Sequence, residues 1–228
     1  MSEPLTPSTG WGVLHLFCKL GAAGVDAELV AGTVKAAQRD EHQVVTFSVF
    51  GHKADLGFMA LGPDWLRLRA LQTGLQAAGL QIADSYVSLT EVSEYAKGMP
   101  EEVLQARLYP KLPPEGKRAF CFYPMSKRRG EGHNWYALRF EDREALMRGH
   151  GATGRTFRGR VVQLITGSTG LDDYEWGVTL FAVRPDDLKD VVYTMRFDEA
   201  SAHYADFGPF YTGVVGELET VLAQVGLA

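Results

Sequence analysis

The chain of 228 residues is long enough to bury a substantial core, as one large domain or two small ones. Apolar residues make up 46% and charged residues 22%, which excludes a disordered chain, and the formal net charge of −5 argues against non-specific nucleic-acid binding. Residues 1–10 lack a signal-peptide pattern, and no apolar run approaches the roughly 20 residues that span a bilayer. Cys18 and Cys121 match no zinc or heme-attachment pattern, so we expect a protein of the reducing cytoplasm without a transmembrane segment.

The first half of the chain alternates between strand and helix patterns. Apolar runs predict strands over 11–20, 43–50, 56–61 and 80–89. Asp26 is a candidate N-cap before one amphipathic helix, and Pro63 with Asp64 opens another. The predicted order is therefore β-α-β-β-α-β.

The second half repeats this order. Strands are predicted over 118–125, 161–166, 175–183 and 210–215, and helices over 141–150 and 185–199. A short echo supports a duplication, because Ala60-x-x-Pro-Asp-x-Leu66 recurs as Ala182-x-x-Pro-Asp-x-Leu188.

Two such halves describe tandem ferredoxin-like βαββαβ units of the α+β class. We place the N-terminal half at 10–97, a proline-rich linker at 98–117 and the C-terminal half at 118–228. Because each sheet must cover its open face, we expect the two halves to pair into one α+β barrel of the dimeric α/β-barrel type.

The segment from Cys121 to Arg129 carries the densest chemical signal. On a strand, Cys121, Tyr123 and Met125 point to one face, while Phe120 and Phe122 point to the other. A proline at position 124 predicts an edge strand or a strand end.

A tyrosine followed by a run of basic residues suits a pocket for an aromatic, polyanionic ligand. Lys127, Arg128 and Arg129 follow Tyr123 closely, and Lys and Arg are the natural partners of carboxylates. The alternative is a core tyrosine followed by a solvated basic turn.

His150 is the second candidate. It continues the apolar face that Leu146 and Met147 begin, and Gly151 in a C-cap position predicts that His150 lies in the last turn of its helix. A neutral imidazole there could ligate iron, and the alternative is a capping or core histidine.

Several segments resemble coproheme decarboxylases, the heme-synthesis branch of the chlorite dismutase superfamily. They cover most of residues 118–211 in the order of that family, and are Tyr123-Pro-Met-Ser-Lys-Arg-Arg, Asn134-Trp-Tyr136, Leu146-Met-Arg-Gly-His-Gly151, Gln163-Leu-Ile-Thr-Gly-Ser-Thr-Gly-Leu-Asp-Asp-Tyr-Glu-Trp-Gly-Val-Thr-Leu-Phe181 and Met195-Arg-Phe-Asp-Glu-Ala-Ser-Ala202.

The resemblance implies an enzyme of heme biosynthesis that assembles as a homopentamer. Its substrate is iron-coproporphyrin III (coproheme), which is also the redox cofactor, and its product is heme b. Two propionates become vinyl groups, and each step consumes hydrogen peroxide and releases carbon dioxide. A transient contact with a coproporphyrin ferrochelatase is expected on the same ground.

The resemblance also assigns roles to residues. Tyr123 matches a tyrosine that becomes a radical, Lys127 matches a lysine beside the second reactive propionate, and His150 matches the proximal iron ligand. The residues expected to bind substrate are Met125, Ser126, Arg128, Trp135, Gln163, Ser201 and Arg107, with Lys111 as a further candidate for the basic rim.

Position 163 separates the branches of the superfamily. Chlorite-degrading members carry an arginine there, whereas this chain has Gln163, which favours the decarboxylase. Some relatives also carry a distal histidine in the segment matching 105–110, where this chain has none. The alternatives are a chlorite dismutase-like enzyme, a heme carrier or regulator without turnover, and a structural pentamer without a ligand.

Overall fold

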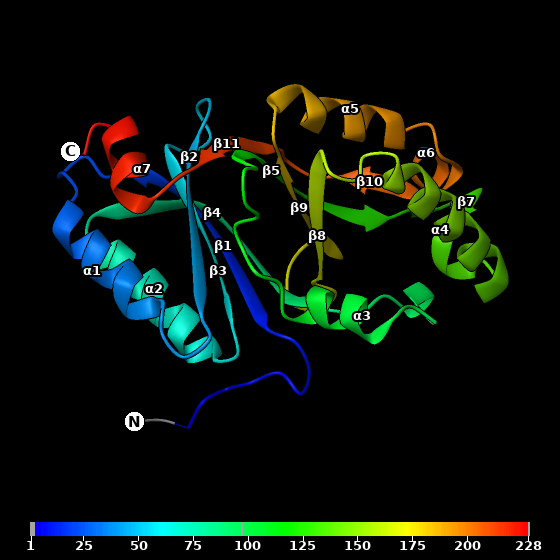
Figure 1. The fold of residues 1–228 in the computed structure, drawn as a ribbon, viewed down its shortest axis with the longest axis horizontal. Helices are drawn as coiled ribbons and strands as arrows, with labels where there is room; N and C mark the ends of the chain where they lie inside the picture. The colour runs from blue at the N-terminus through cyan, green and yellow to red at the C-terminus, as the bar shows by residue number, and fades with distance from the viewer. Residues whose placement is uncertain (1–2, 97, 228) are drawn as a thin grey trace.

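Figure 1 shows the computed structural model of the chain, which describes residues 3–96 and 98–227. Met1, Lys97 and Ala228, which bound segments discussed above, lie outside the described residues. The strands are β1 (Gly12–Leu20), β2 (Gln43–Val49), β3 (Leu56–Gly62), β4 (Leu80–Thr90), β5 (Ala119–Lys127), β6 (Arg129–Gly130), β7 (His133–Asn134), β8 (Val161–Gly167), β9 (Trp176–Ala182), β10 (Ala205–Phe207) and β11 (Tyr211–Val215). The helices are α1 (Ala27–Ala37), α2 (Trp65–Ala77), α3 (Glu101–Leu108), α4 (Phe140–Arg155), α5 (Pro185–Met195), α6 (Glu199–Tyr204) and α7 (Leu218–Gln224), with single 3₁₀ turns η1 (Glu94–Ala96) and η2 (Trp135–Ala137).

Nine of these strands form one sheet that closes on itself. Their order is β10-β5-β11-β2-β3-β1-β4-β8-β9, and an additional pairing of β5 with β9 completes the barrel. Within each half the order of equivalent strands is the same, β2-β3-β1-β4 in the first and β8-β9-β5-β11 in the second. The ladders β11–β2 and β4–β8 join the halves. The predicted fold class, two ferredoxin-like units in an α+β barrel, is confirmed.

The core divides into three clusters: one fills the interior of the barrel, and one lies on the outer face of each half. Inward side chains from both halves fill the barrel, among them Phe47, Phe120, Phe122 and Phe181. Helices α1, α2 and α7 cover the outer face of the first half, although α7 lies at the C-terminal end of the chain (Figure 1). On the second half, α5 covers part of the outer face of β5 and β9.

The helix starts follow the predicted capping chemistry. The Asp26 carboxylate accepts a hydrogen bond from the backbone N–H of Leu29 at 2.9 Å, and Asp64 accepts one from Leu66 at 2.9 Å. These bonds satisfy N–H groups that the first turn of a helix leaves unpaired. No helix within residues 3–96 and 98–227 is both long and apolar enough to cross a membrane.

Four details differ from the sequence prediction. Helix α3 lies inside the segment predicted as a linker. Helix α4 does not end at Gly151 but continues through it to Arg155, so His150 lies within the helix. The single helix predicted over 185–199 is two helices, because Asp198 caps a new one, α6, with its side chain. Helix α7 was not predicted.

Pro124 lies in a strand with neighbours on both sides, so the predicted edge or strand end is wrong. Residues 119–122 of β5 pair with β11 and residues 125–127 pair with β10, while β9 pairs with residues 119–125 on the other side. Pro124 falls between the two partial neighbours, where its carbonyl accepts a hydrogen bond from Gly208 at 2.8 Å. A residue without an N–H is tolerated at this break in the ladder.

A fully buried histidine lies in the interior of the barrel. The ring of His15 lies 4.2 Å from that of Phe122, its Nε2 is 3.0 Å from the Thr179 hydroxyl, and its Nδ1 has no partner among the described residues. Burial lowers the pKa of His15 from 6.5 to about 3, because a charged imidazole is poorly solvated there.

This depressed pKa predicts a loss of stability in acid. Since His15 gains a proton more readily in the unfolded chain, its contribution is present above pH 6.5 and is lost as the pH falls from 6.5 toward 3. We expect the free energy of unfolding to fall by about 1.4 kcal/mol per pH unit from this group. Urea unfolding at several pH values would measure the slope. His15→Leu should flatten it, replacement of the exposed His52 by Gln should not, and equal slopes in wild type and His15→Leu would contradict the assignment.

Candidate active site

One outer face of the C-terminal half gathers the predicted catalytic side chains. Tyr123, Met125 and Lys127 alternate onto the same face of β5, as the spacing predicted. Gln163 on β8 and Cys121 on β5 lie opposite the same β9 residue, so Gln163 shares this face. The two strands are separated only by β9, and the register therefore brings these side chains together.

Tyr123 lies under an aromatic cover from the segment before β11. Its ring stacks on Phe210 with the ring centres 4.5 Å apart, and it meets Phe207 edge-on at 5.6 Å. Burial raises the pKa of the Tyr123 phenol, although the nearby Arg196 guanidinium opposes the shift. The phenol therefore stays protonated near neutral pH.

Lys127 is a buried cation. Its ammonium lies 4.2 Å from the ring centre of Trp135 and donates a 3.4 Å hydrogen bond to the carbonyl of Ala200. Burial lowers the pKa of Lys127 from 10.5 to about 8, an effect that Asp198 and Glu175 partly offset. A lysine with this pKa can both donate a proton and pair with a carboxylate near neutral pH.

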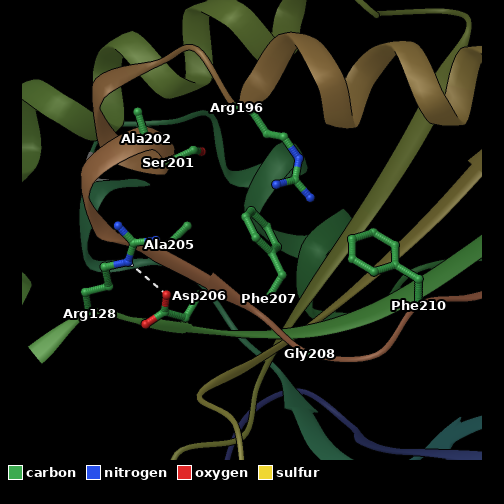
Figure 2. Close-up of a pocket in the computed structure, with 9 residues that line it drawn as sticks. All are labelled: Arg128, Arg196, Ser201, Ala202, Ala205, Asp206, Phe207, Gly208 and Phe210. Atoms are coloured by element: carbon green, nitrogen blue, oxygen red, sulfur yellow. Dashed lines mark hydrogen bonds and ion pairs between the residues drawn. The ribbon is translucent and has the colours of Figure 1, made fainter.

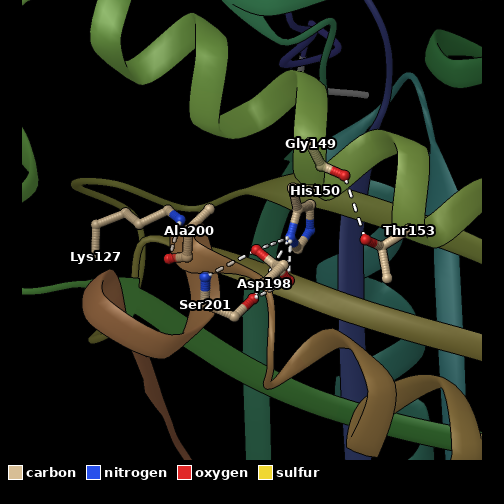
Figure 3. A network of polar contacts seen from close by, with 7 residues as sticks. All are labelled: Lys127, Gly149, His150, Thr153, Asp198, Ala200 and Ser201. Atoms are coloured by element: carbon tan, nitrogen blue, oxygen red, sulfur yellow. Dashed lines mark hydrogen bonds and ion pairs between the residues drawn. The ribbon is translucent and has the colours of Figure 1, made fainter.

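His150 is held from behind by a carboxylate (Figure 3). Its Nδ1 lies 3.1 Å from Asp198 Oδ2, and Asp198 in turn accepts hydrogen bonds from the Ser201 backbone N–H and hydroxyl, both at 3.0 Å. Burial alone would raise the pKa of Asp198, but the hydrogen bonds from His150 and Ser201 outweigh it and hold the pKa below its usual value. The other ring nitrogen, Nε2, remains available as a ligand.

Helix α6 connects these groups. Ala200 receives the Lys127 hydrogen bond, and the next residue, Ser201, binds the carboxylate that orients His150. Figure 3 shows Lys127 and His150 on either side of this short helix start. The predicted lysine and histidine thus belong to one polar network.

A cavity of about 440 Å³ lies against α6 and β10 (Figure 2). Arg128 and Arg196 line it, together with Ser201 and the two phenylalanines that cover Tyr123. Arg196 lies 4.8 Å from the ring centre of Phe207, and Arg128 pairs with Asp206 at 2.8 Å. Two guanidinium groups near an aromatic wall suit a planar ligand that carries carboxylates.

A second cavity of about 430 Å³ lies between α4 and α6 and includes His150. Helix α4 buries none of its side chains and packs mainly on α5, α6 and η1. On β8, Gln163 is exposed and Ile165 is 38% exposed. Apolar and polar side chains of α4 and β8 are therefore accessible to a ligand.

The predicted substrate-binding residues divide into two groups. Met125, Arg128, Trp135, Gln163 and Ser201 lie on the sheet face, beside Lys127 or on the cavity wall. The Ser126 side chain faces the other way, where its hydroxyl accepts a hydrogen bond from the backbone N–H of Glu175 at 3.3 Å, and Arg107 lies in α3 outside this arrangement.

Two functional side chains were not predicted, Arg196 and Asp198. Both fall in the segment that was predicted as continuous helix. An aspartate just before a short run of Glu and small residues is an N-cap signal, and it could have located the start of α6. The contact of Asp198 with His150, 48 residues away, has no local signal.

Comparison with known proteins agrees with this geometry. The chlorite dismutase family model matches residues 25–216 of the chain. The coproheme decarboxylase of Staphylococcus carnosus is 45% identical over 247 residues, covering 97% of this chain and 98% of the relative. A heme-binding protein of Thermus thermophilus superposes with a TM-score of 0.88 at 37% identity, each chain covered completely.

Chlorite dismutase of Candidatus Nitrospira defluvii has a TM-score of 0.78 at 20% identity over 96% of both chains, which shows a shared fold. The chain belongs to the chlorite dismutase family. Within that family it is similar to curated coproheme decarboxylases, as the sequence motifs indicated.

The lowered pKa of Lys127 predicts an unusual titration. In NMR spectra of lysine-labelled protein, we expect the Lys127 signal to shift with a midpoint near pH 8, because burial disfavours its charged form. The reference is the ordinary lysine value of about 10.4. Loss of the signal in Lys127→Gln would assign it, and a midpoint near the ordinary lysine value would contradict the burial argument.

Proposed function

We propose that this chain is a coproheme decarboxylase, which converts two propionates of iron-coproporphyrin III to vinyl groups and yields heme b. The 45% identity to a relative of that name supports the substrate. The observation that carries the proposal is the shared network in which Lys127 and His150 meet through α6, with Lys127 on the same face of β5 as Tyr123. Hydrogen peroxide is the proposed oxidant.

The residues present fit an iron porphyrin. An imidazole whose Nδ1 is bound to a carboxylate presents Nε2 to a metal, and His150 has this arrangement. Coproheme carries four carboxylates, and Arg128 and Arg196 on the cavity wall and Lys127 beside α6 offer cations to them. When bound, the iron porphyrin supplies the oxidation chemistry with peroxide.

Tyr123 is proposed to pass oxidation on to the substrate. Its raised pKa makes the phenolate unfavourable, so the phenol loses an electron and a proton together. The resulting radical takes a hydrogen atom from a propionate, and the second electron would pass to the bound, peroxide-oxidised iron porphyrin as the carboxylate departs as carbon dioxide. For each propionate the balance is one peroxide and one proton consumed, with one vinyl, one carbon dioxide and two waters formed.

Lys127 is proposed to hold the second reactive propionate. With a pKa of about 8 it is largely protonated at neutral pH. The negative charge of an approaching carboxylate would raise this pKa further and so favour the protonated form. Its aromatic neighbour Trp135 restricts the ammonium to one position. This arrangement supports a role in orientation and in proton supply.

Gln163 distinguishes the proposal from chlorite breakdown. It shares the sheet face with Tyr123, and a neutral amide there provides no cation to hold a chlorite anion. The homopentamer, the cytoplasmic location and the contact with a coproporphyrin ferrochelatase stay predictions from the family resemblance.

Replacement of Tyr123 tests the proposed radical. We expect Tyr123→Phe to bind iron-coproporphyrin III, since the ring and its stacking remain, and to lose the first decarboxylation when peroxide is added. Mass spectrometry of the porphyrin would follow the loss of each carboxyl group. Tyr193→Phe, at an exposed tyrosine of α5, is the matched control and should behave as wild type. Normal turnover by Tyr123→Phe would contradict the radical role, and an unchanged porphyrin with the wild-type chain would contradict the whole proposal.

Replacement of Asp198 tests the proposed iron ligand. Asp198→Asn keeps the size of the side chain but weakens the acceptor behind His150, and we expect iron-porphyrin affinity or turnover to fall about tenfold. The iron–histidine stretching frequency should also fall in resonance Raman spectra, because the imidazole becomes a weaker donor. Asp186→Asn changes an exposed carboxylate at the start of α5, outside both cavities, and should leave both measurements unchanged. An unaltered stretching frequency in Asp198→Asn would show that His150 is not the ligand.

A further inference from the structure

Tyr211 is a second buried tyrosine close to Tyr123, and it faces the interior of the barrel. It belongs to the inner cluster with only 6% of its surface exposed, and its ring stacks on Phe17 with the centres 3.7 Å apart. Its hydroxyl donates a 2.5 Å hydrogen bond to Oδ2 of Asp84. A phenol bound to a carboxylate has a proton acceptor in place.

The two tyrosines lie on opposite faces of the same pair of strands. Tyr211 stands directly across the ladder from Phe122, which is the residue before Tyr123. Phe210, the residue before Tyr211, stacks on the Tyr123 ring. An aromatic side chain and a short stretch of backbone therefore connect the two phenols.

The tyrosines of this region differ in what receives their protons. Among the described residues, none accepts a hydrogen bond from the Tyr123 phenol, and the hydroxyl of Tyr86 is paired with the Ser168 hydroxyl. Only Tyr211, of these three, is bound to a carboxylate. Oxidation of a phenol releases its proton, so an adjacent base makes that oxidation easier.

We propose that Tyr211, with Asp84 as its proton acceptor, is a second oxidisable tyrosine that takes over oxidising equivalents from the porphyrin site when no propionate is within reach. The proposal rests on the proposed function, because peroxide acting on a bound iron porphyrin is its source of oxidation. It gives Tyr211 a protective role and no part in the decarboxylation itself.

The transfer balances in electrons and protons. The Tyr211 hydroxyl loses an electron and passes its proton along the existing hydrogen bond to the Asp84 carboxylate. The electron reduces the Tyr123 radical, and the proton that Tyr123 had given up to the porphyrin pocket returns to restore its phenol. The products are a Tyr211 radical and a neutral Asp84.

Lys53 sets the charge around this pair. Its ammonium lies 5.4 Å from the ring centre of Tyr211 and donates a hydrogen bond to the Phe210 carbonyl at 2.7 Å. Before oxidation, the hydrogen-bonded pair of Tyr211 and Asp84 near this cation carries one negative charge, and after proton transfer the pair is neutral. Lys53 therefore disfavours oxidation, which keeps Tyr211 in reserve while Tyr123 has a substrate.

Electron paramagnetic resonance of the chain loaded with heme b tests the proposal. Heme b lacks the two propionates that would be removed, so oxidation by peroxide has no substrate to consume it. Samples frozen within milliseconds of peroxide addition should show a tyrosyl signal, identified by its narrowing with ring-deuterated tyrosine. We expect Tyr211→Phe to lose most of this signal and Asp84→Asn to weaken it, whereas Lys53→Gln should strengthen it.

Tyr86→Phe is the matched control, because it changes another buried tyrosine of the barrel that has no carboxylate partner. It should keep the wild-type signal, and heme absorbance and circular dichroism would establish that each variant folds and binds. A full signal in Tyr211→Phe would overturn the proposal, as would the absence of any tyrosyl signal in wild type.

Mass spectrometry of iron-coproporphyrin III after peroxide addition is a separate experiment that tests the proposed function. Failure of wild type to decarboxylate would overturn the proposed function, while the heme b samples would still decide on Tyr211.

Discussion

Strand β5 lies at the point where the barrel closes, paired with β9 on one side and with β10 and β11 on the other. A closed sheet leaves no free edge, and its strands separate an inner from an outer surface. The two-residue alternation of β5 therefore places Phe120 and Phe122 in the barrel core and Tyr123 and Lys127 in the site. A shift of one residue in this register would exchange the two sets, so packing of the core also fixes the chemistry.

Burial produces different behaviour in the titratable groups of the two surfaces. His15 inside the barrel is held neutral by the loss of solvation, with only a hydroxyl as its partner. Lys127 loses solvation too, which lowers its pKa to about 8, but the carboxylates of Asp198 and Glu175 offset part of this shift. At the site, nearby carboxylates therefore offset only part of the effect of burial on Lys127, and this side chain can change its charge during a reaction.

Local signals predicted much of the fold and a part of the site. Alternation along β5 placed Tyr123 on the outer face, and the capping residues Asp26 and Asp64 located two helix starts. A glycine lowers helix propensity but does not by itself end a helix, and α4 continues past Gly151 to Arg155. The pairing of His150 with Asp198 depends on how α4 and α6 pack, and no pattern within either segment contains that information.

Helix α4 carries His150 and yet has little to hold it in place. It buries no side chain, it contains three glycines at 149, 151 and 154, and its first residue lacks a side-chain cap. Helical glycines cost about 1 kcal/mol each relative to alanine, so the helix depends on what packs against it. A ligand bound by His150 then contributes folding free energy to α4 itself, in the same way that any ligand stabilises the state that binds it. Departure of a product would loosen this helix, and local unfolding of α4 would become a step in ligand exchange, visible as faster exchange of its amide hydrogens.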